Sequence, residues 1–162
     1  MTKPSPAQVI QPPNTLKLKV GAGGFGGIDL AAVAKAEEAL RGLSAQFGEW
    51  LQDELNKMDA ARDAIRTAGY TPATSEQLYM RAHDLKGLGG TYQYPLVTRM
   101  AASLCRITDT AERRADAPLF LIDAHIDAIK AVVRDGIQTD DHPVGRALAE
   151  ELERQVAQHM GG

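Results

Sequence analysis

Residues 78–91 read LYMRAHDLKGLGGT, and their apolar positions recur with the period of an α-helix. On a helical wheel of about 100° per residue, the apolar and small side chains gather on one side, which we expect to be buried. This side consists of Leu78, Ala82, Leu85 and Gly89. The opposite side, which we expect to face solvent, consists of Tyr79, His83, Lys86, Gly87 and Gly90. The stretch therefore predicts a helix that packs through one side and presents a histidine on the other.

The chain before this stretch carries a long apolar stripe that ends at a glycine. Over residues 29–68, apolar side chains recur at steps of three, four and seven residues, as in an amphipathic helix. Gly42 and Gly48 lie within this range, so we expect either two helices or one bent helix. Gly69 is a typical helix end, and we expect residues 70–73 to form a turn.

Start signals divide the rest of the chain into further helices. Thr74 with Gln77 three residues later has the capping-box pattern, which predicts a helix over about 75–90. Proline favours the first position of a helix, and further starts are expected at Pro95, near Pro118 and at Asp140–Pro143. No segment between 29 and 160 alternates like a strand, so we expect an all-α protein built as an antiparallel helical bundle.

Residues 1–27 differ from the rest in composition. They contain four prolines and, from Gly21 onward, five glycines, which resists the formation of a packed core. Leu16–Val20 alternates like a short strand but has no obvious partner. Gly21–Gly26 matches the dinucleotide-binding pattern G-x-G-x-x-G, but the parallel strands that such a site needs do not follow it. We expect 1–27 to be a flexible arm and 28–162 to form one helical domain.

The overall composition narrows the class of protein. A length of 162 residues suits about one domain, with 44% hydrophobic and 24% charged residues. Aromatic residues make up only 5%, so we expect no basic groove lined with stacking rings and no nucleic-acid binding; the formal charge is −3. The N-terminus lacks the apolar stretch of a signal peptide, and no apolar run approaches the ~18 residues of a membrane span. We expect a soluble, cytoplasmic protein that does not bind membranes.

Three glycines close together in a helix need an explanation, because each costs roughly 1 kcal/mol of helix stability relative to alanine. Close packing against a neighbouring helix explains Gly89, which lies on the side expected to be buried. Gly87 and Gly90 lie on the side of His83, which indicates that something large approaches the imidazole. A free imidazole is largely an unprotonated nucleophile at neutral pH, and Lys86 is placed to neutralise an arriving phosphoryl group.

The chain reads His83-Asp84-Leu85-Lys86-Gly87, followed by Gly89-Gly90 and by a helix with Leu104-Cys105. This sequence resembles the histidine-containing phosphotransfer (HPt) domain. The pattern of that family is His-x-x-Lys-Gly with small residues just after it, on the second helix of a bundle. The resemblance covers about 75–108 by motif and about 45–140 by helix order.

The resemblance implies a four-helix bundle, here with an extra N-terminal helix, that serves as a phosphorelay intermediate. His83 would accept a phosphoryl group from the aspartyl-phosphate of one receiver domain and pass it to another. Lys86 would hold that group, and Gly87 and Gly90 would make room for the receiver. The partners would be receiver domains of response regulators or of hybrid histidine kinases. The Mg²⁺ would belong to the receiver, so we expect no metal or cofactor on this chain.

Some positions are assigned less directly, and one departs from the family. Tyr79 is expected to rim the docking surface, and Arg99 on the third helix to meet an acidic face of the receiver. Many family members have glycine ten residues after the histidine, where this chain has Gln93. Cys105, the single cysteine, excludes an internal disulfide and is expected to be a small buried residue. The other histidines, which are expected to be ordinary surface or core residues without metal-ligand spacing, are His125, His142 and His159.

Two alternatives to the relay remain open at this point. One is an adaptor bundle that docks receivers without being phosphorylated. The other is a dimeric phosphotransferase like the dimerisation region of histidine kinases, whose signature also has an acidic residue after the histidine, as Asp84 is here. That signature has a proline where this chain has Leu88, and the helix from Pro95 is short for it. We expect a monomer, with no ATP-dependent kinase activity of its own.

Overall fold

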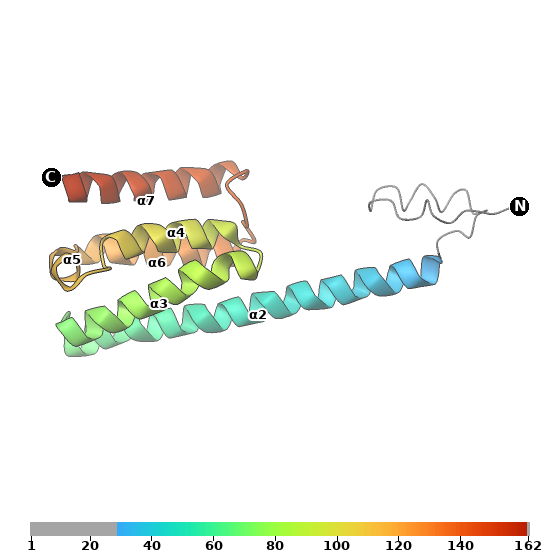
Figure 1. The fold of residues 1–162 in the computed structure, drawn as a ribbon, viewed down its shortest axis with the longest axis horizontal. Helices are drawn as coiled ribbons and strands as arrows, with labels where there is room; N and C mark the ends of the chain where they lie inside the picture. The colour runs from blue at the N-terminus through green and yellow to red at the C-terminus, as the bar shows by residue number, and fades with distance from the viewer. Residues whose placement is uncertain (1–28, 162) are drawn as a thin grey trace, which may run out of the picture. The chain divides into compact units, whose positions relative to one another are not determined.

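The computed structural model describes residues 29–161, and this part of the chain is helical without any strand (Figure 1). The predicted all-α class is therefore confirmed for these residues. The predicted arm over 1–27, with its strand-like segment, lies outside the described residues. The helices are α2 (Leu30–Ala68), α3 (Pro72–Thr91), α4 (Pro95–Arg106), α5 (Ala111–Asp116), α6 (Leu119–Arg134) and α7 (Pro143–Gly161).

The chain divides into two units, residues 1–46 and residues 47–162. The described part of the first unit is the beginning of α2, in which almost every side chain is exposed, including Leu30 and Leu40. The second unit contains the rest of α2 and all the later helices. α2 is one helix of 39 residues, so neither Gly42 nor Gly48 divides it. A glycine inside an α-helix lowers the stability of the helix only modestly, so α2 continues through both positions.

The connection between α2 and α3 differs from the predicted turn. Gly69 ends α2 with a φ of +90°, a conformation that glycine adopts without steric cost, as expected. α3 then begins at Pro72 with Thr71 as its N-cap, so the predicted cap at Thr74 is wrong by three residues. The cap is Thr71, whose hydroxyl accepts a hydrogen bond of 3.1 Å from the Thr74 N–H. The Thr74 hydroxyl accepts one of 2.9 Å from the Thr71 N–H, which completes a capping box with threonine in place of the usual acid.

The predicted proline starts agree with the structure, and one helix was not predicted. Pro95 and Pro143 are the first residues of α4 and α7, and Pro118 is the N-cap residue of α6. The short α5 is capped by Thr110, whose hydroxyl accepts from the Arg113 N–H at 3.1 Å. α5 has no buried residue, so it has no apolar stripe from which it could be recognised.

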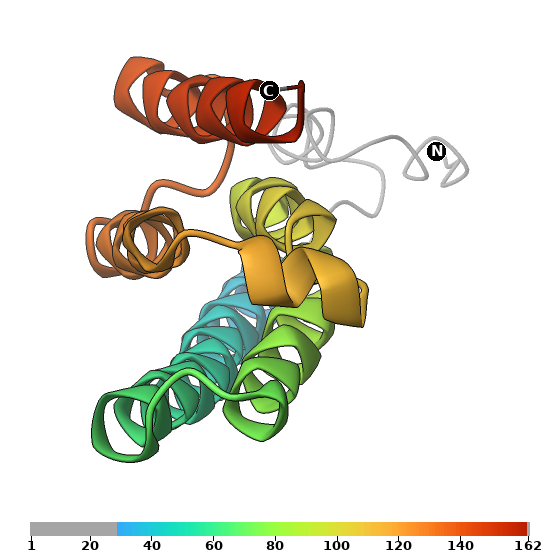
Figure 2. The same ribbon diagram turned by 90° about the vertical axis from the view of Figure 1, so that its left-hand side faces the viewer.

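The core of the second unit lies between its helices. α4 contacts α3, α6 and α7, and α3 also contacts α5. Figures 1 and 2 both show α3 beside the C-terminal part of α2. A fully buried leucine or isoleucine contributes about 2 kcal/mol to folding, so this core is the main source of stability. The largest fully buried side chains are Leu51, Leu55, Met58, Leu78, Leu85, Leu96, Met100, Leu104, Ile107, Leu121, Ile122 and Ile126.

Arg62 and His125 are buried in this core, and each has polar partners on other residues. The Arg62 guanidinium, on α2, forms ion pairs with Asp59 at 3.0 Å and with Asp127 of α6 at 2.9 Å. His125, which is fully buried, lies 2.8 Å through Nδ1 from the Leu121 carbonyl oxygen and 3.0 Å through Nε2 from the Ser103 hydroxyl. Because a carbonyl oxygen only accepts, Nδ1 carries the proton. The sequence predicted that His125 is an ordinary surface or core residue, and the structure shows that it is a core residue.

Candidate functional site

The outward side of α3 carries the residues that the motif singled out. Leu78, Ala82 and Leu85 are completely buried, and Gly89 is buried with them, so the predicted packing side is confirmed. This orientation turns the opposite side of the helix away from the core. On that side His83, Gly87 and Gly90 are exposed, and Tyr79 and Lys86 are half-buried.

Gly89 is required by the close approach of α3 to α4. A Cβ atom at this position would lie 2.6 Å from the Thr98 hydroxyl oxygen and 2.7 Å from the Thr98 nitrogen. It would also lie 3.0 Å from the Tyr94 carbonyl oxygen. Two of these three atoms belong to the backbone and cannot move aside cheaply. The predicted packing role of Gly89 is therefore confirmed.

Gly87 and Gly90 stand in open space instead. A Cβ atom at Gly87 would meet nothing within 4 Å among the described residues, and one at Gly90 would meet only the Thr98 hydroxyl at 3.9 Å. Packing among the residues that the structure describes therefore does not explain these two glycines. Their effect is to leave bare backbone next to His83, on the same side of the helix.

Thr98 of α4 forms hydrogen bonds to the backbone of α3 on either side of Gly87. Its hydroxyl donates to the Lys86 carbonyl oxygen at 2.8 Å and accepts from the Gly90 N–H at 2.9 Å. In a regular α-helix these two backbone groups pair with each other, so the threonine hydroxyl bridges one rung of the helix. Sequence reasoning did not find Thr98, because a single threonine in an amphipathic helix carries no signal of what its hydroxyl contacts.

The imidazole of His83 is exposed and has no hydrogen bond or ion pair within residues 29–161. Its neighbour is the Tyr79 ring, with centroids 5.9 Å apart and planes tilted by 52°. The Arg114 guanidinium lies over the same tyrosine ring, 5.5 Å from its centroid. Arg114 also donates to the Thr108 carbonyl oxygen at 2.8 Å. The tyrosine ring thus neighbours both the histidine and an anchored cation. The sequence did not indicate this cation, because Arg114 lies on α5, a helix that was not predicted.

The Lys86 ammonium is the cation on the same outward side of α3 as His83. In the described part of the chain it has no hydrogen bond and no ion pair, whereas most other basic side chains of the second unit are paired. A half-buried lysine without a carboxylate partner can neutralise an incoming anion without first breaking an ion pair. The site therefore combines an accessible ring nitrogen, an unpaired positive charge and open backbone.

Arg99 is engaged within the protein. Its guanidinium donates to both carboxylate oxygens of Glu153 on α7, at 2.7 and 2.8 Å, and to Asp140 at 3.2 Å. These ion pairs raise the pKa of Arg99 and lower that of Glu153, in each case chiefly through the hydrogen bond between them. The structure therefore gives Arg99 a role in joining α4 to α7. Its predicted contact with a receiver would compete with these bonds.

The remaining candidates for chemistry are ordinary. Cys105 is buried, as predicted, and burial raises the pKa of its thiol to about 11, so it is not a thiolate nucleophile at neutral pH. Within residues 29–161, no three histidine, cysteine, aspartate or glutamate side chains are grouped so that they could hold a metal ion. In the same residues, no helix is long and apolar enough to cross a lipid bilayer.

Comparisons of the chain with models of protein families, with curated protein sequences and with solved structures gave no match. The functional assignment therefore rests on the motif and on the geometry of this site.

Proposed function

We propose that this protein is a cytoplasmic phosphorelay intermediate with a four-helix bundle of the HPt type, and that His83 is the phosphoacceptor. The observation that carries the proposal is the arrangement of one side of α3. An exposed and unpartnered His83 stands there with the unpaired Lys86 and with the open backbone of Gly87 and Gly90.

The proposed step is a transfer between an aspartate oxygen and a ring nitrogen. The unprotonated nitrogen of His83 attacks the phosphorus of a receiver aspartyl-phosphate, the N–P bond forms as the P–O bond breaks, and the carboxylate leaves. Lys86 neutralises part of the charge on the outer oxygens of the phosphoryl group during transfer. A second receiver, with its own Mg²⁺, takes the group in the reverse reaction. The chain itself supplies no metal to the step.

Docking of the receiver would use the surface around His83. The missing side chains at Gly87 and Gly90 would admit the loops that surround the receiver aspartate. The half-buried Tyr79, fixed by Arg114, would form one edge of this surface. Arg99 is a weaker part of the proposal, because docking through it would have to replace its bonds to Glu153 and Asp140.

The test is transfer of label from receiver domains phosphorylated with radiolabelled acetyl phosphate. We expect acid-labile, base-stable label on the wild-type chain and none on His83→Gln. His142→Gln is the matched control, because His142 is also an exposed histidine but lies away from α3, one residue before α7. It should accept label at the wild-type rate. Incubation with ATP alone should label neither protein.

The same experiment separates the adaptor alternative from the relay. Binding of receivers without transfer from any of them would indicate an adaptor bundle and overturn the role of His83. Equal labelling of wild type and His83→Gln would place the acceptor elsewhere. The dimeric phosphotransferase is disfavoured by the 12-residue length of α4, because that class needs two long helices in a hairpin.

A further inference from the structure

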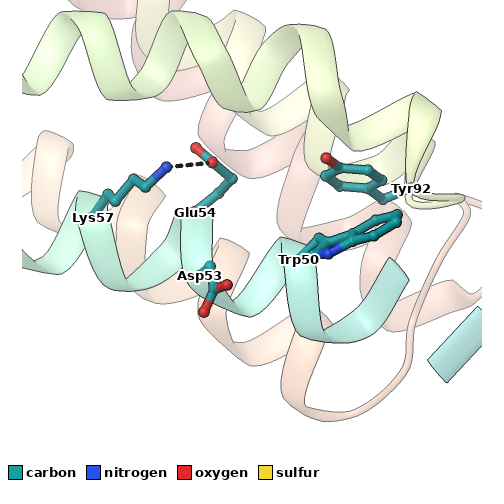
Figure 3. A pocket seen from close by; sticks show the side chains of 5 residues that line it. All are labelled: Trp50, Asp53, Glu54, Lys57 and Tyr92. Atoms are coloured by element: carbon teal, nitrogen blue, oxygen red, sulfur yellow. Dashed lines mark hydrogen bonds and ion pairs between the residues drawn. The ribbon is translucent and has the colours of Figure 1, made fainter. Parts of the chain in front are cut away.

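A pocket separate from the His83 surface lies in the second unit, where α2 passes the C-terminal end of α3. It is lined by Trp50, Asp53, Glu54 and Lys57 of α2 and by Tyr92, the C-cap residue of α3 (Figure 3). Three of these side chains are exposed to solvent, so the pocket is open at the surface. An open pocket of this kind suits a side chain presented by a partner better than an enclosed small molecule.

Two aromatic rings form the walls of this pocket. The Trp50 and Tyr92 rings face each other with centroids 5.7 Å apart and planes tilted by 46° (Figure 3). Phe47 packs against both rings, at 5.8 Å from Trp50 and 5.6 Å from Tyr92, and so fixes their positions. Trp50 nevertheless stays 39% exposed, so part of its ring surface is open to solvent. The faces of such rings attract cations.

The charges around the rings favour a cation as well. Glu54 is neutralised by Lys57, whose ammonium donates to it at 2.8 Å. Asp53, one turn after Trp50 on α2, has no hydrogen bond or ion pair within residues 29–161. α3 has no basic residue in its last turn, so no positive side chain of its own offsets the negative end of its dipole near Tyr92. A carboxylate and a helix C-terminus thus act on the same pocket.

We propose that this pocket binds an arginine side chain of a partner protein. The planar guanidinium stacks on the exposed face of Trp50 beside Tyr92 and donates two hydrogen bonds to the Asp53 carboxylate. Arginine fits better than lysine, because a flat guanidinium can satisfy an aromatic face and a carboxylate at the same time, whereas an ammonium is a strongly hydrated point charge. The site is independent of His83 and does not require that the chain be phosphorylated.

Trp50 is the single tryptophan of the chain, so its fluorescence reports on this pocket directly. We would titrate the full-length protein with an acetylated, amidated glycine–arginine–glycine peptide. The matched ligand contains citrulline, which has the shape of arginine without the charge. We expect a saturable change with arginine and a dissociation constant at least about tenfold higher with citrulline. Equal binding of the two peptides would overturn the proposal, and equal binding of a lysine peptide would overturn the choice of arginine.

Two variants that remove a negative or a positive charge from the pocket test the proposal further. Asp53→Asn should weaken arginine binding about tenfold, and Lys57→Gln should strengthen it, because Glu54 then loses its neutralising partner. Asp63→Asn is the matched control on the same helix, since Asp63 is exposed and, among the described residues, its carboxylate pairs with Arg66 alone. It should bind like wild type. Unchanged affinity in Asp53→Asn would show that Asp53 does not bind the guanidinium and would contradict the proposal. This outcome does not depend on whether His83 is phosphorylated.

Discussion

The hydroxyl of Thr98 donates a hydrogen bond of 2.8 Å to the main-chain carbonyl oxygen of Lys86. Through its second bond, to the Gly90 N–H, the same oxygen ties α4 to both sides of Gly87. The exposed glycines weaken the end of α3, because glycine is a poor helix former. Thr98 offsets this weakness from the neighbouring helix while it leaves the outward side of α3 free.

Replacing Thr98 by valine should therefore destabilise the protein. Valine has nearly the same shape but cannot bridge Lys86 and Gly90, so we expect the free energy of unfolding to fall by about 1–2 kcal/mol. Urea denaturation followed by circular dichroism measures this loss. Thr67→Val is the control, because Thr67 is exposed and its hydroxyl donates to carbonyl oxygens of its own helix. A loss in Thr67→Val as large as that in Thr98→Val would contradict the bridging role.

The two glycines at 87 and 89 should respond to alanine in opposite directions. Gly87→Ala adds a methyl group in open space and should raise the free energy of unfolding by about 0.5–1 kcal/mol, through helix propensity alone. Gly89→Ala drives a methyl group into the Thr98 backbone and should lower it by about 1–3 kcal/mol. Thermal and urea unfolding of the two variants measure both values.

A bulky residue at position 87 should affect docking of a receiver without affecting the stability of the protein. A Cβ atom at position 87 meets nothing within 4 Å in the described residues, so we expect Gly87→Leu to fold as well as Gly87→Ala. It should nevertheless slow phosphoryl transfer, because the side chain occupies the room that a receiver needs next to His83. Transfer at the wild-type rate in Gly87→Leu would mean that receivers do not approach across this glycine.

Lys86 should matter for transfer and not for folding. Because its ammonium has no ion pair in the described residues, Lys86→Gln should leave the free energy of unfolding unchanged. We expect the rate of transfer to His83 to fall about 10- to 100-fold, through the loss of charge stabilisation at the phosphoryl group. Rapid-quench measurement of labelled protein gives this rate.

Lys130→Gln is the contrasting control for Lys86→Gln. Lys130 binds Asp59 at 2.7 Å, so its loss should reduce stability and leave transfer unchanged. Identical effects of the two substitutions on the transfer rate would argue against a specific role for Lys86.

The buried His125 should make the protein less stable in mild acid. Burial lowers the pKa of His125 in the folded state, although its bond to the Leu121 carbonyl acts in the opposite direction. The unfolded chain then binds a proton that the folded chain does not, so stability is highest above the unfolded pKa of about 6.5 and falls below it. The loss is up to about 1.4 kcal/mol per pH unit until the folded pKa is reached.

Urea unfolding at pH 7.5 and pH 5.5 measures this dependence. Between these two pH values the ion-paired carboxylates Asp59 and Glu153 stay deprotonated, because their ion pairs lower their pKa values. They therefore do not contribute to the measured change. His142→Gln should keep the full dependence, since His142 is exposed. Nuclear magnetic resonance of the His125 ring should show titration at a lower pH than in the unfolded chain. Titration of His125 at or above the unfolded value would contradict this account.

The sequence by itself determined the helical class, the order of the long helices and the orientation of α3. These depend on the period of apolar residues and on local stop and start signals, which act over a few residues of the chain. The buried side of Leu78 and Leu85 and the outward position of His83 follow directly from that period. The start of α3 was misplaced because its capping box uses Thr71 and Thr74, a pair that resembles an ordinary turn.

Only the tertiary structure decided which distant side chains meet. Thr98 reaches the backbone of α3, Arg99 pairs with Glu153, and Trp50 faces Tyr92. The members of each pair lie on different helices, and the periodicity of one helix shows which side is buried but not which residue of another helix lies opposite. The partners are selected when the whole core packs at high density, because close-packed side chains interlock in one arrangement that no single segment encodes.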